Sequence, residues 1–116
     1  MGKRKEGCVV KPKWSPHAKG LLADILYAIT TELSEEDALR WRNRIQAATD
    51  QLADFPNIGT AIPLVCFNTP PEDADKLRQV ICKPYRIVYE SLGDEIHILS
   101  IRHSRMLVAE GDTYWN

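Results

Sequence analysis

The chain has 116 residues, a length that fits one domain, and its 44% hydrophobic and 27% charged content is typical of a globular protein. Fifteen lysines and arginines nearly balance sixteen aspartates and glutamates, which leaves a net charge of −1. A dedicated nucleic-acid binder usually carries a large basic excess, so this balance argues against that class, although a local basic patch can exist within a neutral total. No apolar run reaches the roughly 20 residues that span a bilayer.

We expect a single domain over residues 1–116, with a flexible leader at residues 1–7 and a C-terminal tail at residues 107–116. The leader is basic, but no apolar stretch follows it, so it does not resemble a signal peptide. The three cysteines are widely spaced and form no CxxC motif: Cys8, Cys66 and Cys82. This spacing argues against a disulfide framework or a zinc site. We expect free thiols in a reducing cytoplasm, and neither a metal nor another cofactor.

The N-terminal half predicts one strand and two helices. Residues 8–14 form a short strand, and Pro12 places it at a sheet edge because proline cannot donate a hydrogen bond to a neighbouring strand. Ser15 is a good N-cap residue before a proline, which predicts a helix over residues 16–33. Ser34 and the acids after it resemble a capping box, so a second helix follows at once. With almost no linker between them, the two helices form an antiparallel hairpin.

Apolar residues along the second helix alternate steps of three and four, which predicts one buried face: Ala38, Trp41, Ile45, Ala48, Leu52 and Phe55. The stretch from Phe55 to Gly59 then ends the helix in a turn.

The C-terminal half predicts strands. A short apolar strand at residues 61–67 precedes a loop rich in proline and acids. Further strands are expected over residues 77–83, 85–91 and 96–101, the last two joined by a hairpin turn. Short connections make adjacent strands antiparallel, so the helices gather on one face. We therefore expect an α+β fold of the order β-α-α-β-β-β, in which an N-terminal helical hairpin packs on a small, mainly antiparallel sheet.

Four motifs, in their order along nearly the whole chain, resemble the RelE/ParE toxin superfamily. Residues 14–18 (WSPHA) are similar to the start of that family's first helix, and residues 52–59 (LADFPNIG) to its L-x-x-x-P-x-x-G motif. Residues 77–78 (LR) with residues 85–89 (YRIVY) match its lR…yRiiY pattern. Residues 98–105 (ILSIRHSR) resemble its i-x-I-x-H-x-x-R ending. Each motif is weak alone, but four in the right order are specific.

The resemblance implies the toxin of a type II toxin–antitoxin system, neutralised by a cognate antitoxin that lays an extended or helical segment over it. ParE-like members, among them plasmid stabilisation toxins, act on DNA gyrase. RelE-like members are metal-independent, ribosome-dependent mRNA endonucleases (mRNA interferases). We expect a ParE-like gyrase inhibitor, because residues 61–67 lack the lysine usual in RelE-like nucleases and the charge is near neutral. The alternatives are a RelE-like mRNA endonuclease and an inactive antitoxin-binding scaffold.

The resemblance also nominates site residues. RNA cleavage without a metal needs groups that transfer protons and stabilise charge on the phosphate. If the chain is a nuclease, its catalytic residues are Arg86, His103 and Arg105. The candidates for contact with the target or the antitoxin are Arg78, Arg86, Arg102 and Arg105. These arginines form one basic cluster only if the strand register brings them to one side of the sheet, and register is not fixed by sequence.

Each candidate also has a purely structural explanation. Arg86 lies between aromatic residues and could stack on Tyr85 or Tyr89. Arg78 could pair with an acid of the preceding loop. His103 is of the residue type best suited to proton transfer at neutral pH, but it could equally serve as a structural hydrogen-bonding residue.

Overall fold

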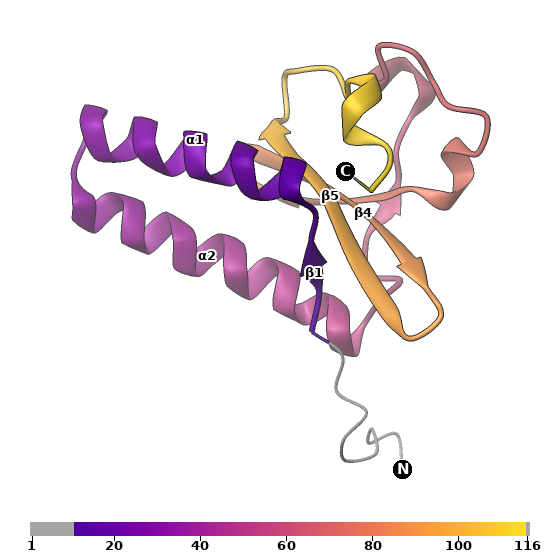
Figure 1. The fold of residues 1–116 in the computed structure, drawn as a ribbon, viewed down its shortest axis with the longest axis horizontal. Helices are drawn as coiled ribbons and strands as arrows, with labels where there is room; N and C mark the ends of the chain where they lie inside the picture. Colours follow the sequence, from indigo (N-terminus) through magenta and orange to yellow (C-terminus); the bar gives the residue numbers. More distant parts are fainter. Residues whose placement is uncertain (1–10, 116) are drawn as a thin grey trace.

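The computed structural model describes residues 11–115, so the expected leader and the beginning of the expected first strand lie outside the described residues. A helical hairpin covers one face of a five-stranded sheet (Figure 1). The strand order is β1-β5-β4-β3-β2; β1 pairs with β5 in parallel, and the other pairs are antiparallel. The α+β fold predicted from the sequence is confirmed.

The hairpin consists of α1 (Pro16–Glu32) and α2 (Glu35–Asp54). The strands are β1 (Lys13–Trp14), β2 (Thr60–Ala61), β3 (Arg78–Cys82), β4 (Tyr85–Leu92) and β5 (Glu95–His103). The connections contain the 3-10 helices η1 (Leu64–Cys66), η2 (Ala74–Lys76) and η3 (Glu110–Asp112). The two longest strands, β4 and β5, lie inside the sheet and form its rigid centre.

Serine caps begin both helices, as the sequence predicts. The Ser15 hydroxyl accepts a hydrogen bond from the Ala18 N–H at 3.0 Å. The Ser34 hydroxyl accepts one from the Asp37 N–H at 3.0 Å. These bonds satisfy N–H groups that have no partner within the helix. They fix where each helix begins. Leu33 is the C-cap residue of α1, and the N-cap residue of α2, Ser34, follows it directly.

The core has two parts, one on each face of the sheet. Beneath the helices lie Ala18, Ile45, Leu52, Ile87, Tyr89, Ile96, Ile98 and Ile101. On the opposite face, called the outer face below, lie Ile62, Phe67, Leu77, Val88, Leu99 and Val108. Strand β5 supplies both parts because successive side chains of a strand point to opposite faces, and its pairing with β4 shifts by one residue beside Val88. Such a bulge lets Ile98 and Ile101 both reach the helix side, while Leu99 reaches the outer face.

The predicted strand over residues 61–67 was wrong in its extent. Only Thr60 and Ala61 pair with β3, and the chain then turns through η1. Pro63, which precedes η1, has no N–H to donate to a sheet partner. Ile62 and Phe67, at the two ends of this turn, are buried in the outer-face core. The apolar stretch therefore covers the sheet and does not extend it.

Candidate functional site

The four candidate arginines do not lie on one face. The β4–β5 register pairs Arg86 with Arg102, and both side chains leave the sheet on the outer face. Arg78 pairs with the helix-side residue Tyr89, and its Nη1 donates to the Gly59 carbonyl at 2.5 Å. Arg105 lies beyond the end of β5 and is exposed. The four arginines therefore lie in three different places: two on the outer face, one on the helix side and one beyond the end of β5.

Arg86 holds the outer face together. It is only 8% exposed. Its Nε donates to Gln79 Oε1 at 2.7 Å, and its Nη1 donates to the Met106 carbonyl at 3.0 Å. Its Nη2 contacts the Sγ of Cys66 at 3.6 Å. The guanidinium therefore joins β3, η1 and the segment after β5, which is a structural role.

Arg102 is neutralised by a fully buried carboxylate. Asp112 accepts hydrogen bonds from Arg102 Nε at 2.6 Å and Nη2 at 3.1 Å. It also accepts from the Ala109 N–H at 2.9 Å and contacts His17 Nε2 at 2.7 Å. Burial raises the pKa of Asp112, but these hydrogen bonds outweigh it and hold the pKa below the ordinary value of 3.8. The ionised carboxylate fastens η3 to β5 and to the start of α1.

His103 lies on the other side of the sheet from Arg86. It pairs with Tyr85, its Nδ1 accepts the backbone N–H of Arg105 at 3.2 Å, and its ring meets the Tyr85 ring edge-on at 6.2 Å. Trp41 packs edge-on against the same tyrosine at 5.4 Å, and burial raises the pKa of Tyr85. The structure does not bring the three residues nominated for catalysis around a single point.

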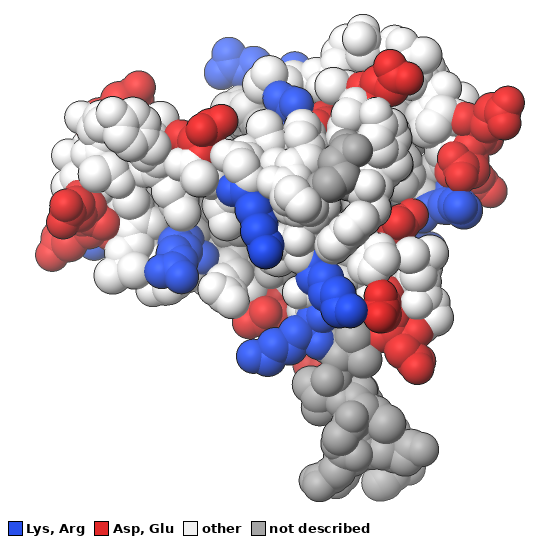
Figure 2. Space-filling model, viewed as in Figure 1, with Lys and Arg blue, Asp and Glu red and all other residues white. Residues whose placement is uncertain are grey.

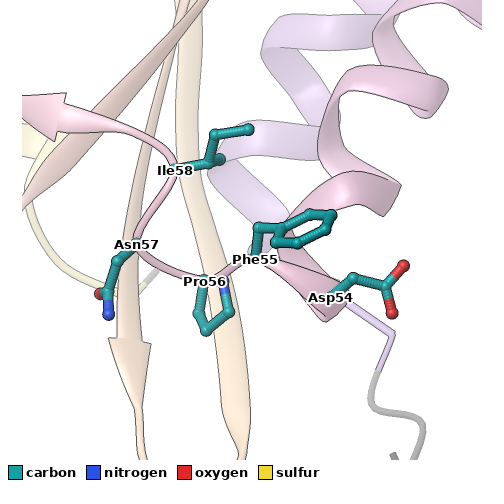
Figure 3. Close-up of a pocket in the computed structure, with 5 residues that line it drawn as sticks. All are labelled: Asp54, Phe55, Pro56, Asn57 and Ile58. Atoms are coloured by element: carbon teal, nitrogen blue, oxygen red, sulfur yellow. The ribbon is translucent and has the colours of Figure 1, made fainter. Parts of the chain in front are cut away.

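An apolar hollow of about 470 Å³ lies at the end of α2 (Figure 3). It is lined by Asp54, Phe55, Pro56, Asn57 and Ile58. Phe55, expected on the buried face of the second helix, is 61% exposed, and Ile58 is 49% exposed. Their side chains project to the same side of the turn in Figure 3. Exposed apolar side chains around a hollow are suited to protein recognition.

The turn beneath this hollow is rigidly supported. The buried hydroxyl of Tyr89 donates to the Pro56 carbonyl at 2.8 Å and accepts the Gly59 N–H at 3.0 Å. A Cβ at Gly59 would lie 2.6 Å from the Gln79 carbonyl oxygen and 2.7 Å from the Tyr89 ring. Only glycine fits this close approach, which explains the glycine of the L-x-x-x-P-x-x-G motif.

A second group of exposed apolar side chains belongs to the segments that Arg86 joins on the outer face. This outer-face patch consists of Leu64, Val65, Ile81, Met106 and Leu107. Beside it, β2 pairs with Arg78 and Gln79 only, so no described strand covers the edge of β3 beyond Gln79. An open strand edge flanked by apolar side chains is a site where another chain can add a strand.

The sequence did not nominate the polar residues that matter most to this geometry, His17 and Asp112. They lie 95 positions apart in the chain. Neither belongs to a local motif that signals a buried pair, so only the folded chain reveals their contact.

Comparisons with known proteins identify the class. A family model described as the ParE toxin of the type II toxin–antitoxin system parDE matches residues 13–108. The chain therefore belongs to the ParE toxin family.

Among solved structures it resembles one described as the chromosomal ParDE system of P. aeruginosa, with a TM-score of 0.64 and 22% identity over 84% of this chain and 98% of that one. That likeness supports the fold. The comparison with curated proteins gave no match. Within residues 11–115, no helix combines the length and apolarity needed to cross a membrane.

Proposed function

We propose that this ParE toxin inhibits growth in the cytoplasm by binding DNA gyrase, and not by cleaving RNA. One observation supports the proposal: the polar side chains suited to acid–base chemistry are either held in hydrogen bonds within the protein or separated from one another by the sheet. Arg86 and Arg102 are held by internal hydrogen bonds on the outer face, and His103 lies on the other side of the sheet. Metal-independent cleavage needs a proton-transfer group and a charge stabiliser at the same phosphate. The arrangement favours a surface for binding a protein.

The apolar hollow at the end of α2 is our candidate for contact with the target. Phe55 and Ile58 are large, exposed and adjacent, and the hydrogen bonds of Tyr89 hold their turn in place. Large apolar anchors on a rigid frame lose little conformational entropy on binding, so they supply much of the affinity of a protein interface. A near-neutral total charge fits this mode better than attraction to phosphates.

A cognate antitoxin is the second proposed partner, and in a plasmid-borne pair this toxin would serve plasmid stabilisation. The outer-face patch and the open edge of β3 suit an extended antitoxin segment with alternating apolar side chains. Of the four candidate arginines, Arg105 is exposed and its guanidinium forms no hydrogen bond or ion pair with a described residue. It is therefore the one best able to meet an acidic antitoxin side chain.

The test is induction of this chain alone in bacteria, with DNA breaks and messenger integrity measured in parallel, and supercoiling by purified gyrase assayed with the purified chain. We expect DNA breaks, intact messages and inhibited supercoiling. We expect Phe55→Ala to weaken gyrase inhibition at least roughly tenfold, the size of an interface anchor's contribution. Tyr27→Ala, which removes an equally exposed aromatic from α1, is the matched control and keeps full inhibition.

Messages cut within ribosomes, with gyrase unaffected, would show instead that the chain is an mRNA endonuclease. An absence of any growth defect, together with tight binding of the neighbouring antitoxin, would identify an inactive scaffold.

A further inference from the structure

A cleft of about 200 Å³ lies where β1 meets the base of the helical hairpin. It is lined by Trp14, Lys19, Leu22, Arg42, Ile45 and Gln46. The set contains two cations and no acid, and neither Lys19 nor Arg42 forms an ion pair with any residue between 11 and 115. The cleft therefore suits a carboxylate carried next to an apolar side chain.

The opposite end of the hairpin offers that chemistry. Leu33, in the turn between the helices, is 66% exposed, and Leu39 is 53% exposed. Glu35 begins α2 between them and is also exposed. None of the three is needed to cover this domain's own core. The tip thus combines an acid with uncovered apolar surface.

The tip and the cleft lie on the same side of the hairpin. Residues three and four apart share a helix face, and Lys19, Leu22, Leu26 and Thr30 follow that spacing along α1, which leads to Leu33 at its C-cap. The same spacing along α2 aligns Glu35, Leu39, Arg42 and Gln46. Arg42 lies two turns along α2 from Glu35, and Lys19 lies further toward the base. Figure 2 shows acidic side chains at the far end of the hairpin and basic side chains over its base beside β1. One continuous face therefore runs from an acidic, apolar tip through Arg42 to a basic end.

We propose that this face binds a second copy of the chain, with the two hairpins antiparallel. A two-fold axis then places Glu35 of each copy against Arg42 of the other, so the same ion pair forms twice. It also places Leu39 of each copy beside Leu39 of the other at the axis, and it carries the exposed Leu33 toward the apolar floor of the cleft in the other copy. A parallel arrangement would oppose acid with acid and cation with cation, so charge selects the antiparallel one. This inference does not depend on gyrase being the target.

The size of the face predicts a weak dimer. Pairing Glu35 with Arg42 of the other copy limits the overlap to about 11 residues, from Leu33 to the level of Arg44, or about 17 Å at 1.5 Å per residue. Two helices packed about 10 Å apart present a face about 20 Å wide, so each copy buries roughly 340 Å². The pair would bury roughly 700 Å², less than most specific interfaces bury. We therefore expect dissociation in the high micromolar range.

Sedimentation equilibrium of the purified full chain, with charge-swapped variants, tests the proposal. Arg42→Glu and Glu35→Arg each turn two attractive contacts into repulsive ones, and we expect each to weaken the dimer at least about tenfold. An equimolar mixture of the two variants restores both pairs in a heterodimer, so dimerisation should return. Arg40→Glu is the control, because it makes the same charge change on a different side of α2, where the arginine pairs with Asp37 of its own helix.

The altered side chains are exposed, so circular dichroism should show that each variant folds. Leu39→Ser is a second, charge-free variant that should also weaken the dimer. A chain that stays monomeric at all concentrations would overturn the proposal, as would a mixture of the swapped variants that fails to dimerise. If Arg42→Glu weakens antitoxin binding while the chain alone is monomeric, the cleft serves the antitoxin and the proposal is wrong.

Discussion

Two regions of this toxin carry cations in opposite circumstances. On the outer face of the sheet, Arg86 and Arg102 are largely enclosed and fully engaged by Gln79, the Met106 carbonyl and Asp112. In the cleft near the base of the hairpin, Lys19 and Arg42 are exposed to solvent, and no acid is among the described residues that line the cleft. The same side-chain type therefore stabilises the fold in one place and remains available for recognition in the other. Burial and partners decide the role, and the first two predictions below test the enclosed side of this contrast.

The largest expected effect follows from removing the buried carboxylate. Asp112→Ala leaves Arg102 partly buried without its counter-charge and frees η3 from β5. Breaking a buried ion pair by removing one partner costs about 3 kcal/mol or more in the free energy of unfolding. Urea denaturation measures it. Asp73→Ala, which breaks the exposed pair with Lys76, is the control and should leave the midpoint unchanged. Equal midpoints for wild type and Asp112→Ala would show that the pairing of Arg102 with Asp112 does not stabilise the fold.

Acid should remove the same stabilisation. Because the folded-state pKa of Asp112 lies below 3.8, the ionised carboxylate stabilises the fold fully above its unfolded-state pKa. That stabilisation is lost as the pH falls from the unfolded-state value through the lower folded-state value. We therefore measure the free energy of unfolding of wild type and Asp112→Ala by urea denaturation between pH 7 and pH 3. The difference between the two should become smaller below about pH 4. A gap independent of pH would mean that Asp112 acts by shape and not by charge.

The smallest effect is expected on the helix side, where Tyr89 supplies the buried polar support of the turn. Tyr89→Phe leaves the Gly59 N–H and the Pro56 carbonyl without a partner. Two unsatisfied groups, one of them partly reached by water, should cost about 1 to 2 kcal/mol. The control is Tyr27→Phe, which loses only an exposed hydroxyl. If the two variants unfold at the same urea concentration, the turn does not depend on that hydroxyl.

Much of the fold was predictable because its signals are local. Ser15 and Ser34 cap the helices as expected, and Gly93 adopts the positive φ of 60° that the predicted hairpin turn between β4 and β5 requires. The prediction at residues 61–67 was wrong because apolar composition alone does not separate a strand from a buried turn. Phe55 fits the helical period yet lies exposed, because it is the C-cap residue of α2 and its backbone, with φ −133° and ψ 74°, no longer follows the helix whose face buries Leu52.

The sequence by itself determined the elements of this protein, its family and the identity of its candidate arginines, because caps, periodicity and ordered motifs act over a few residues. Only the tertiary structure decided what those arginines do. Strand register sent Arg86 to one face and His103 to the other, and a bulge in β5 set which side each of its residues faces. The contact of Asp112 with His17 joins positions 95 apart, and a pairing over that distance forms only when the sheet brings the two ends of the chain together.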